Sequence, residues 1–251
     1  WHRCVPETGP VWRVAGIDGC RAGWAVVVRE RTSDGTLRHE FRLVPRFAEI
    51  LADESLAVLA LDMPIGLPDR AGPGGRGPER TVRPHLGARQ SSVFSVPSRA
   101  AVFATDYAEA CRLALATSDP PRKVSRQAFN LFGKIREIDA VMTPDLEARV
   151  FEVHPELAFW RLNGERPMAL PKKVKSTAHG PGLDERSALL ATFGIAPAFL
   201  DRKRPAGVGR DDLVDAAVNA VIAEHISAGR AVSFPKTPER DGRGLRMAIW
   251  A

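Results

Sequence analysis

Apolar residues recur along the first sixty positions in short runs that turn residues separate. Residues 12–17 are predicted to form a strand that ends at Asp18, and a short glycine-bearing turn leads into a second strand at 23–31. Alternating residues at 36–44 predict a third strand, and a short helix is expected at 46–53. The carboxylate of Asp18 therefore stands where a buried strand gives way to a turn, which needs an explanation.

One continuous apolar run, LAVLAL at 56–61, is typical of a strand that is buried on both faces of a sheet, and it ends at Asp62. The following segment, 63–100, is rich in Pro, Gly and Arg, and we interpret it as a long loop. Because loops of this length inside a compact domain usually have a function, we expect one here. Helices are expected at 104–117 and 123–141.

The second half of the chain alternates between strands and helices. Residues 147–155 predict a strand, with Pro155 placed to open a helix. A basic loop at 171–182 precedes a helix at 183–194, and the strongest helix of the chain is expected at 210–229. The tail predicts a short hairpin from the segments AVSF and MAIW. This order of elements is typical of an α/β fold with a mixed sheet.

The length of 251 residues and the apolar content of 44% suit one large domain or two small ones with a real core. We expect a disordered leader at 1–10 and treat 11–251 as a single domain, with an insertion at about 63–146. No apolar run approaches the roughly 18 residues that a membrane span requires. The three cysteines are scattered, which disfavours a disulfide framework or a zinc ribbon and favours a cytoplasmic location.

The formal net charge of +6 weakly favours polyanionic partners, since net charge affects association more than fold. Its distribution is more informative, because residues 70–99 carry six arginines and a single acidic residue, Glu79. A solvated basic loop and a phosphate-binding surface explain this segment equally well. The arginines are Arg70, Arg76, Arg80, Arg83, Arg89 and Arg99.

Carboxylates stand at the ends of two predicted strands and at the start of the last helix. Asp18 and Asp62 end the strands, and Asp211, Asp212 and Asp215 begin the helix. Positions 212 and 215 are three apart and face the same side, whereas we expect Asp211 to point elsewhere. Taken singly, each has a simpler explanation as a turn residue or a helix cap. Taken together, they predict four carboxylates that converge where the strands and the helix meet.

Converging carboxylates repel one another, so they either take up protons or bind a cation. A hard divalent ion suits their oxygen atoms, and Mg²⁺ keeps coordination sites for water and phosphate. Two such ions about 4 Å apart activate the attacking water and stabilise the leaving oxygen in phosphodiester cleavage. We therefore predict a site for Mg²⁺ or Mn²⁺ that hydrolyses a phosphodiester, with the metal ligands and catalytic residues Asp18, Asp62, Asp212 and Asp215.

Glu152 is a fifth candidate catalytic residue. In the segment RVFEVHPE it alternates onto the same face of its strand as His154, opposite Phe151 and Val153. It is a candidate metal ligand or base on the site side of the sheet, and the alternative is an edge-strand glutamate paired with a basic group. His154 directly precedes a predicted helix, so a structural role and a role in binding substrate both remain open.

Five ordered motifs carry a family resemblance, namely GIDGCRAGW, LDMPIGLP, LGARQSSVFSVP, FEVHPE and DDLVDAAVNA. Between about residues 13 and 235, the chain resembles the DUF429 proteins, a family of predicted RNase H-fold nucleases. The resemblance implies an RNase H-like mixed β-sheet flanked by helices, with the Arg/Pro/Gly-rich segment as an insertion after the fourth strand. It also implies acids on the first and fourth strands and the last helix, at Asp18, Asp62, Asp212 and Asp215. The segment DDLVDAA is similar, in addition, to the catalytic helix of bacterial Holliday-junction resolvases, in which two aspartates are three apart.

Cationic and hydroxyl side chains are expected to hold a phosphodiester beside these acids. Arginine forks to a phosphate, hydroxyls add hydrogen bonds, and the lysines near Lys173 are candidates for contact with a backbone phosphate. A solvated basic loop explains those lysines equally well. Nucleic acid is the expected partner, although the few aromatic residues suggest no stacking groove for a single strand. The predicted substrate-binding residues are Arg83, Arg89, Ser91, Ser92, His154, Lys172 and Lys175.

Two other functions share some of these features. An actin-like-superfamily phosphotransferase has a related fold, and GIDGCRAG resembles its first phosphate loop, but such enzymes need two domains and a second glycine-rich phosphate loop. The other is a non-catalytic nucleic-acid or nucleotide-binding protein, although a surface that binds anions gains nothing from clustered carboxylates. The sequence has neither a GxxxxGK[ST] nor a GxSxG motif. It leaves DNA, RNA and small phosphodiesters open as substrates and is compatible with a homodimer.

Overall fold

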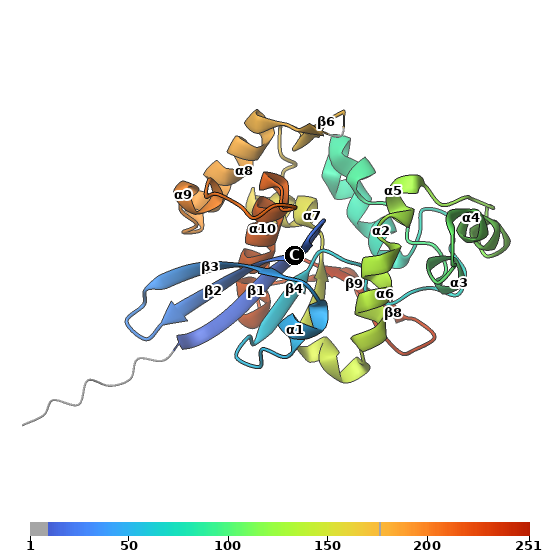
Figure 1. Cartoon of the computed structure of the whole chain (residues 1–251), viewed down its shortest axis with the longest axis horizontal. Coiled ribbons are helices and arrows are strands. Elements are labelled where there is room, and N and C mark those ends of the chain that lie inside the picture. Colours follow the sequence, from blue (N-terminus) through green and yellow to red (C-terminus); the bar gives the residue numbers. More distant parts are fainter. Residues whose placement is uncertain (1–9, 176) are drawn as a thin grey trace, which may run out of the picture.

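A mixed sheet of seven strands organises the chain, with the strand order β3-β2-β1-β4-β5-β9-β8 (Figure 1). The computed structural model describes residues 10–175 and 177–251. The strands of the sheet are β1 (Pro10–Cys20), β2 (Gly23–Thr32), β3 (Leu37–Val44), β4 (Val58–Leu61), β5 (Val150–Val153), β8 (Ser233–Arg240) and β9 (Arg246–Trp250). The expected mixed sheet is therefore confirmed.

The carboxyl ends of three strands meet at one edge of this sheet. The first hairpin closes tightly, with Cys20 opposite Gly23, and β3 continues the antiparallel meander. Strands β1, β4 and β5 then run parallel, in the register that pairs Ile17 with Leu61. Because parallel strands end at the same edge, Asp18 near the end of β1 and Asp62 after β4 become neighbours. The backbone N–H of Asp62 donates to the carbonyl of Ile17 at 2.9 Å.

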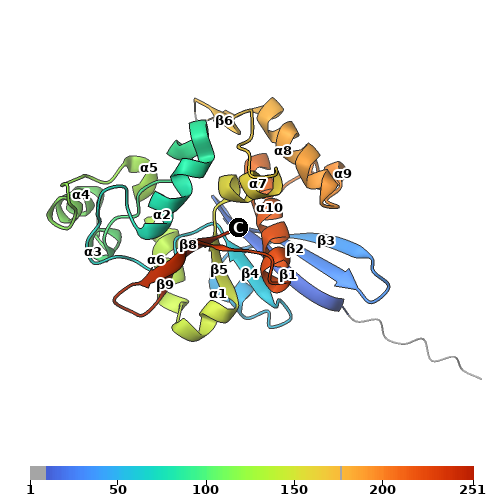
Figure 2. The same ribbon diagram turned by 180° about the vertical axis from the view of Figure 1, so that it is seen from behind.

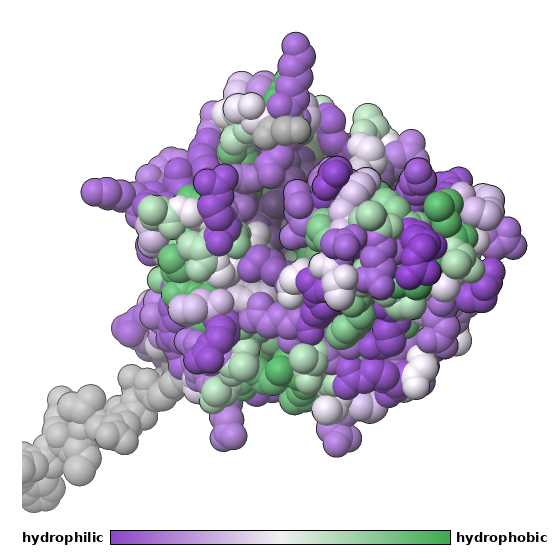
Figure 3. All heavy atoms as spheres, turned by 45° about the vertical axis from the view of Figure 1, so that its right-hand side comes forward, coloured by the Kyte–Doolittle hydropathy of each residue, from purple (hydrophilic) through white to green (hydrophobic). Residues whose placement is uncertain are grey.

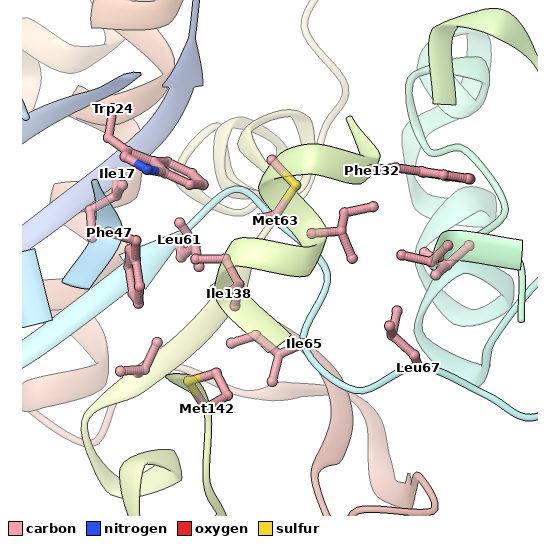
Figure 4. Packing of buried hydrophobic residues seen from close by; sticks show 14 of the residues in the cluster. Ile17, Trp24, Phe47, Leu61, Met63, Ile65, Leu67, Phe132, Ile138 and Met142 are labelled. Carbon is pink, nitrogen blue, oxygen red and sulfur yellow. The ribbon is translucent and has the colours of Figure 1, made fainter. Parts of the chain in front are cut away.

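One face of the sheet is covered by α1 (Phe47–Leu51) and α6 (Phe132–Val141). The strands present alternate residues to each face, so Ile17, Trp24 and Leu61 all point toward this layer. Figure 4 shows these three side chains packed with Phe47 and Ile138 in one apolar cluster. The indole N–H of Trp24 also donates to Glu137 Oε1 of α6 at 3.1 Å. This core fixes the strand ends from one side.

The opposite face is covered by the long helix α10 (Arg210–Ser227), which packs on β1, β2 and β4. Gly16 makes the approach close, because a Cβ atom there would lie 2.0 Å from the backbone N of Ala220 and 2.1 Å from the carbonyl oxygen of Ala216. Asn219 Nδ2 donates to the carbonyl of Ile17 at 3.1 Å. Three shorter helices adjoin α10 on this side of the sheet: α7 (Pro155–Leu162), α8 (Gly180–Thr192) and α9 (Pro197–Leu200).

The segment between β4 and β5 is more helical than the sequence predicts. Its elements are α2 (Gly77–Val82), η1 (Arg83–Ser92), α3 (Arg99–Val102), α4 (Tyr107–Ala116), α5 (Arg126–Phe129), α6 and η2 (Pro144–Ala148). The interpretation of 63–100 as a loop therefore holds only for 63–76 and 93–98, and the single helix expected at 123–141 is broken into α5 and α6. In Figures 1 and 2, α2–α5 lie to one side of the strand ends and α8 and α9 lie to the other.

A buried arginine explains why this segment holds its fold. The Arg76 side chain is fully buried and donates to both carboxylate oxygens of Glu152 on β5, at 2.5 and 3.1 Å. It also donates to Glu79 Oε1 at 2.8 Å and to the carbonyls of Ile65 and Gly66. The guanidinium therefore ties α2 and the chain after β4 to the centre of the sheet. Short helices of this kind depend on such tertiary contacts, which no local pattern reveals.

Several boundaries differ from the expected ones. The helix expected at 183–194 begins three residues earlier, at Gly180, and the helix expected at 210–229 ends at Ser227. The basic loop contains a small hairpin of β6 (Lys173–Val174) and β7 (Thr177–Ala178), and the tail hairpin is confirmed as β8 and β9. The expected leader lies outside the described residues except for Pro10, which begins β1. Within the described residues, no helix combines the length and apolarity that crossing a membrane requires.

Candidate functional site

A cavity of about 400 Å³ opens at the carboxyl ends of β1, β4 and β5. It receives residues from η1 on one side and from α7, the 171–173 segment and α10 on the other. Figure 3 shows a hollow on the face in view that is lined mainly by hydrophilic residues, with apolar patches around it. The charged and histidine side chains on its walls are Asp18, Asp62, Arg89, His154, Glu156, Lys172, Lys173, Asp211, Asp212 and Asp215. We call this cavity the acidic pocket.

Three carboxylates stand at the centre of the acidic pocket. Burial, together with repulsion by Asp62 and Asp215, raises the pKa of Asp18 well above its ordinary value. Burial likewise raises the pKa of Asp62 to about 7, although the nearby Lys172 opposes this shift. The pKa of Asp215 is also raised by its burial. These groups are therefore hard to ionise together, and a cation placed among them would relieve the repulsion.

Lys172 is the cation that the structure brings into this cluster. Its Nζ donates to Asp215 Oδ2, and its side chain is only 21% exposed. Burial alone would lower the pKa of Lys172, but attraction to Asp215 and Glu156 outweighs it and raises this pKa above the ordinary value. The ammonium is thus charged. The sequence predicts that Lys172 binds a substrate phosphate, whereas in the structure it binds the carboxylate of Asp215.

The start of α10 corrects one expectation about the aspartates. Asp211, expected to point elsewhere, lines the acidic pocket and pairs with Lys173 at 2.7 Å. Residues 211 and 215 are four apart and therefore share a helix face. Asp212 also reaches the pocket wall, but its Oδ2 accepts a hydrogen bond from the Gly209 backbone N–H at 2.8 Å. That bond completes the amino-terminal cap of α10.

Arg89, Ser91 and Ser92 line the acidic pocket from η1. Arg89 Nη2 also donates to the carbonyl of Ala169 at 2.9 Å. His154 Nε2 lies 3.4 Å from the carbonyl oxygen of Ser92, and burial lowers the pKa of His154 to about 4. The imidazole is therefore neutral near pH 7, and its role in binding substrate stays a prediction.

Three predicted site residues lie away from the pocket walls. Arg83 donates to the carbonyl of Val93 and to the hydroxyl of Ser95, so it stabilises the chain around η1. Lys175 is exposed in the small hairpin, with a positive φ of 48°. Glu152 is on a central strand and not an edge strand, and its carboxylate is held by Arg76. Burial raises the pKa of Glu152 to about 7 despite that contact.

One charged pair at the pocket was missed by the sequence reasoning. Both oxygens of Glu156 accept hydrogen bonds from Arg186 Nη2 at 2.8 Å, and the Arg186 side chain is fully buried. A signal was present in the motif FEVHPE, because an acid directly after Pro155 belongs to the first turn of α7. Its partner is 30 residues away in sequence and could not be read from the motif.

The donor chemistry of the pocket fits a hard divalent ion. Asp215 is 4% exposed, and its Oδ1 is buried without a hydrogen-bond partner. A buried carboxylate oxygen in this condition is a ready ligand, and Asp18 and Asp62 supply further oxygens beside it. Among residues 10–175 and 177–251, no three Asp, Glu, His or Cys side chains are arranged closely enough to hold an ion without moving. Ion binding would therefore draw these carboxylates together.

Comparison with protein-family models matches residues 16–240 of this chain to the family described as "Protein of unknown function (DUF429)". The match covers all five motifs noted in the sequence and ends at Arg240, the last residue of β8. Neither the curated proteins nor the solved structures contain a match.

Proposed function

The chain belongs to the DUF429 family, and we propose that its acidic pocket is the active site of a divalent-metal-dependent nuclease with an RNase H-like fold. The observation that carries this proposal is the convergence of Asp18, Asp62 and Asp215 in one cavity, although they come from two strands and a helix. Acids gathered from distant segments, with raised pKa values, are typical of a functional site.

The strand arrangement supports the RNase H-like part of the proposal. The antiparallel meander β1–β3 is followed by β4 and β5, which run parallel to β1, and the last long helix packs on β1. Asp18 and Asp62 then fall on the first and fourth strand ends, and Asp215 falls on the last helix, as the resemblance implies. In this description the segment between β4 and β5 is the insertion, and it supplies Arg89, on one wall of the pocket.

Asp18, Asp62 and Asp215 are the residues that would hold Mg²⁺ or Mn²⁺, with Asp212 as a further candidate ligand. The ion supplies activation of water and compensation of the negative charge that develops in phosphodiester hydrolysis. Arg89 and Lys173 are placed to bind substrate phosphates, because an acidic centre alone would repel them. The hydroxyls of Ser91 and Ser92 add donors on the same wall, so the substrate backbone would lie between η1 and the 171–173 segment.

Replacement of Asp18 by Asn tests the proposal. Asn keeps the size of the side chain but removes the charge that holds the ion, so cleavage should fall by about two orders of magnitude or more. Folding should be retained or improved, because the change relieves repulsion among buried carboxylates. The assay uses labelled single-stranded DNA, duplex DNA, RNA–DNA hybrid and four-way junctions, with Mg²⁺ or Mn²⁺ and with EDTA.

The matched control is Asp145→Asn, which changes an exposed aspartate of η2 in the same way. It should cleave at the wild-type rate. Cleavage that persists in EDTA, or that is unchanged by Asp18→Asn, would contradict the proposed mechanism.

One observation favours a second candidate, a non-catalytic protein that binds nucleic acid or nucleotides. Lys172 already compensates Asp215 without an ion, and the basic side chains Arg89 and Lys173 remain on the walls. Such a protein would bind the substrates of the same panel without cutting any of them, with or without divalent ions. The cleavage assay therefore separates the two functions.

A further inference from the structure

We propose that the Lys172 ammonium acts as a built-in cation of the acidic pocket, so that the pocket takes one divalent ion and not two. The inference rests on the proposed function, because it concerns how the same site holds its metal. The partner of Lys172 in this role is the carboxylate of Asp215, and not the substrate phosphate that the sequence predicts.

The position of Lys172 supports this role. Its Nζ contacts Asp215 Oδ2, while the other oxygen of that carboxylate, Oδ1, is buried and unpartnered. One carboxylate thus meets a cation on one side and offers a free oxygen on the other. Asp18 and Asp62 line the same cavity, so a divalent ion at Oδ1 would have these two acids as its neighbours. A second divalent ion at Oδ2 would have to displace Lys172.

The backbone that carries Lys172 is held firmly, so the ammonium is no loose surface charge. Glu185 of α8 accepts hydrogen bonds from the backbone N–H groups of Ala169 and Leu170, both at 2.9 Å. Arg186 Nη1 donates to the carbonyl of Leu170 at 3.0 Å, and the His179 N–H donates to the carbonyl of Lys172 at 2.8 Å.

Helix α8 also fits closely against this backbone. A Cβ atom at Gly182 would lie 1.9 Å from the carbonyl oxygen of Pro171, so only a glycine permits the contact. Arg186 in turn binds Glu156 of α7 through a fully buried guanidinium. The 169–172 segment is therefore fixed to two helices, and the position of Lys172 follows from the fold.

The charge balance at the centre of the pocket gives the number of ions. Asp211 is paired with Lys173 and Glu156 is paired with Arg186, while Asp212 keeps its charge but directs Oδ2 to the Gly209 N–H, where the positive end of the α10 dipole compensates it. Asp18, Asp62 and Asp215 remain, with Lys172 as their cation. Three carboxylates and one ammonium leave two negative charges, which a single divalent ion balances. Without Lys172, the negative charge of the third carboxylate has no cation beside it, and this favours the binding of a second ion.

Counting bound ions tests the inference without any cleavage assay. Mn²⁺ is titrated into the full chain at neutral pH, and free Mn²⁺ is followed by electron paramagnetic resonance, with isothermal calorimetry as a second count. We expect one ion for the wild-type chain and two for Lys172→Met, which keeps an unbranched side chain but removes the charge. Lys172→Arg restores a cation and should return the count to one. Lys236→Met is the matched control, because Lys236 is exposed on β8 and does not line the acidic pocket, and this variant should also bind one ion.

Two ions in the wild-type chain, no ion at millimolar Mn²⁺, or one ion in a folded Lys172→Met variant would each overturn the inference. If Lys172→Met does not fold, as judged by circular dichroism, Lys172→Gln replaces it and must bind two ions. The two proposals fail separately. A count of one that becomes two in the variant, with no cleavage of any substrate, supports the cation role and contradicts the nuclease.

Discussion

Asp212 holds two positions at once, at the wall of the acidic pocket and at the first turn of α10. Its Oδ2 accepts a hydrogen bond from the Gly209 N–H. Removal of the carboxylate therefore leaves this N–H without its partner at the start of α10, in addition to any loss of a metal ligand. A single alanine substitution would therefore mix the two effects. Asparagine separates them, because its amide oxygen accepts the same hydrogen bond without the charge.

We expect Asp212→Ala to lower the free energy of unfolding by about 1 kcal/mol through loss of the capping bond. Asp212→Asn should leave the free energy of unfolding within about 0.5 kcal/mol of the wild type, because the amide keeps the capping bond and burial, together with repulsion by Asp211, raises the pKa of Asp212 and so disfavours the lost charge. If Asp212 is a ligand, the Asn variant should nevertheless bind Mn²⁺ at least tenfold more weakly. Urea denaturation and the Mn²⁺ titration measure both quantities. An Asn variant as unstable as the Ala variant would contradict the capping role.

Between elements, the contact of β1 with α10 decides whether the acids meet. Residues 14, 16 and 18 alternate toward the same face of β1, so Gly16 and Asp18 both face α10. Because Gly16 lets the strand touch the backbone of Ala216 and Ala220, Asp18 lies within one cavity with Asp215. The glycine thus serves the site although it has no side chain to contribute.

Gly16→Ala should lower the free energy of unfolding by about 3 kcal/mol or more, because the added methyl group meets backbone atoms that cannot move alone. It should also weaken Mn²⁺ binding by separating Asp18 from Asp215. Gly133→Ala is the control, since nothing lies within 4 Å of the Cβ position at this exposed residue of α6. This control should be stabilised by about 0.5–1 kcal/mol. Equal stability of both variants in urea would show that β1 and α10 do not pack as described.

Over the whole molecule, the net charge of +6 contrasts with the acidic centre of the pocket. The cations Arg89 and Lys173 line the same pocket as the acids, so they would attract a polyanion that the carboxylates alone would repel. A nucleic-acid ligand would release counterions on binding, so its affinity should fall with salt concentration.

We expect Arg89→Ala to reduce the slope of log K against log salt by about 1, the loss of one phosphate contact. Fluorescence anisotropy with a labelled oligonucleotide measures this slope, in the Asp18→Asn background to prevent cleavage. Arg38→Ala is the control, because Arg38 is exposed on β3, opposite Glu30 and far along the strand from the pocket end. If Arg89→Ala lowered log K by the same amount at every salt concentration, without a change of slope, a phosphate contact by Arg89 would be excluded.

The amino-acid sequence by itself determined the strands β1–β5, the long helix α10 and the acids at their ends. These features are local, since alternation, continuous apolar runs and helix stop signals depend on neighbours within a few residues. The short helices between Gly77 and Val102 were missed, because buried contacts such as that of Arg76 with Glu152, 76 residues apart, stabilise that segment.

Only the tertiary structure decided which of the carboxylates are held in ion pairs and which remain available to bind an ion. In the fold, Lys172 forms an ion pair with Asp215, 43 residues away, and Lys173 forms one with Asp211. Glu152 is held in a buried ion pair with Arg76. Ion pairs between distant segments leave no trace in periodicity. They form because burial makes an uncompensated charge costly, and the fold determines which opposite charge lies within reach.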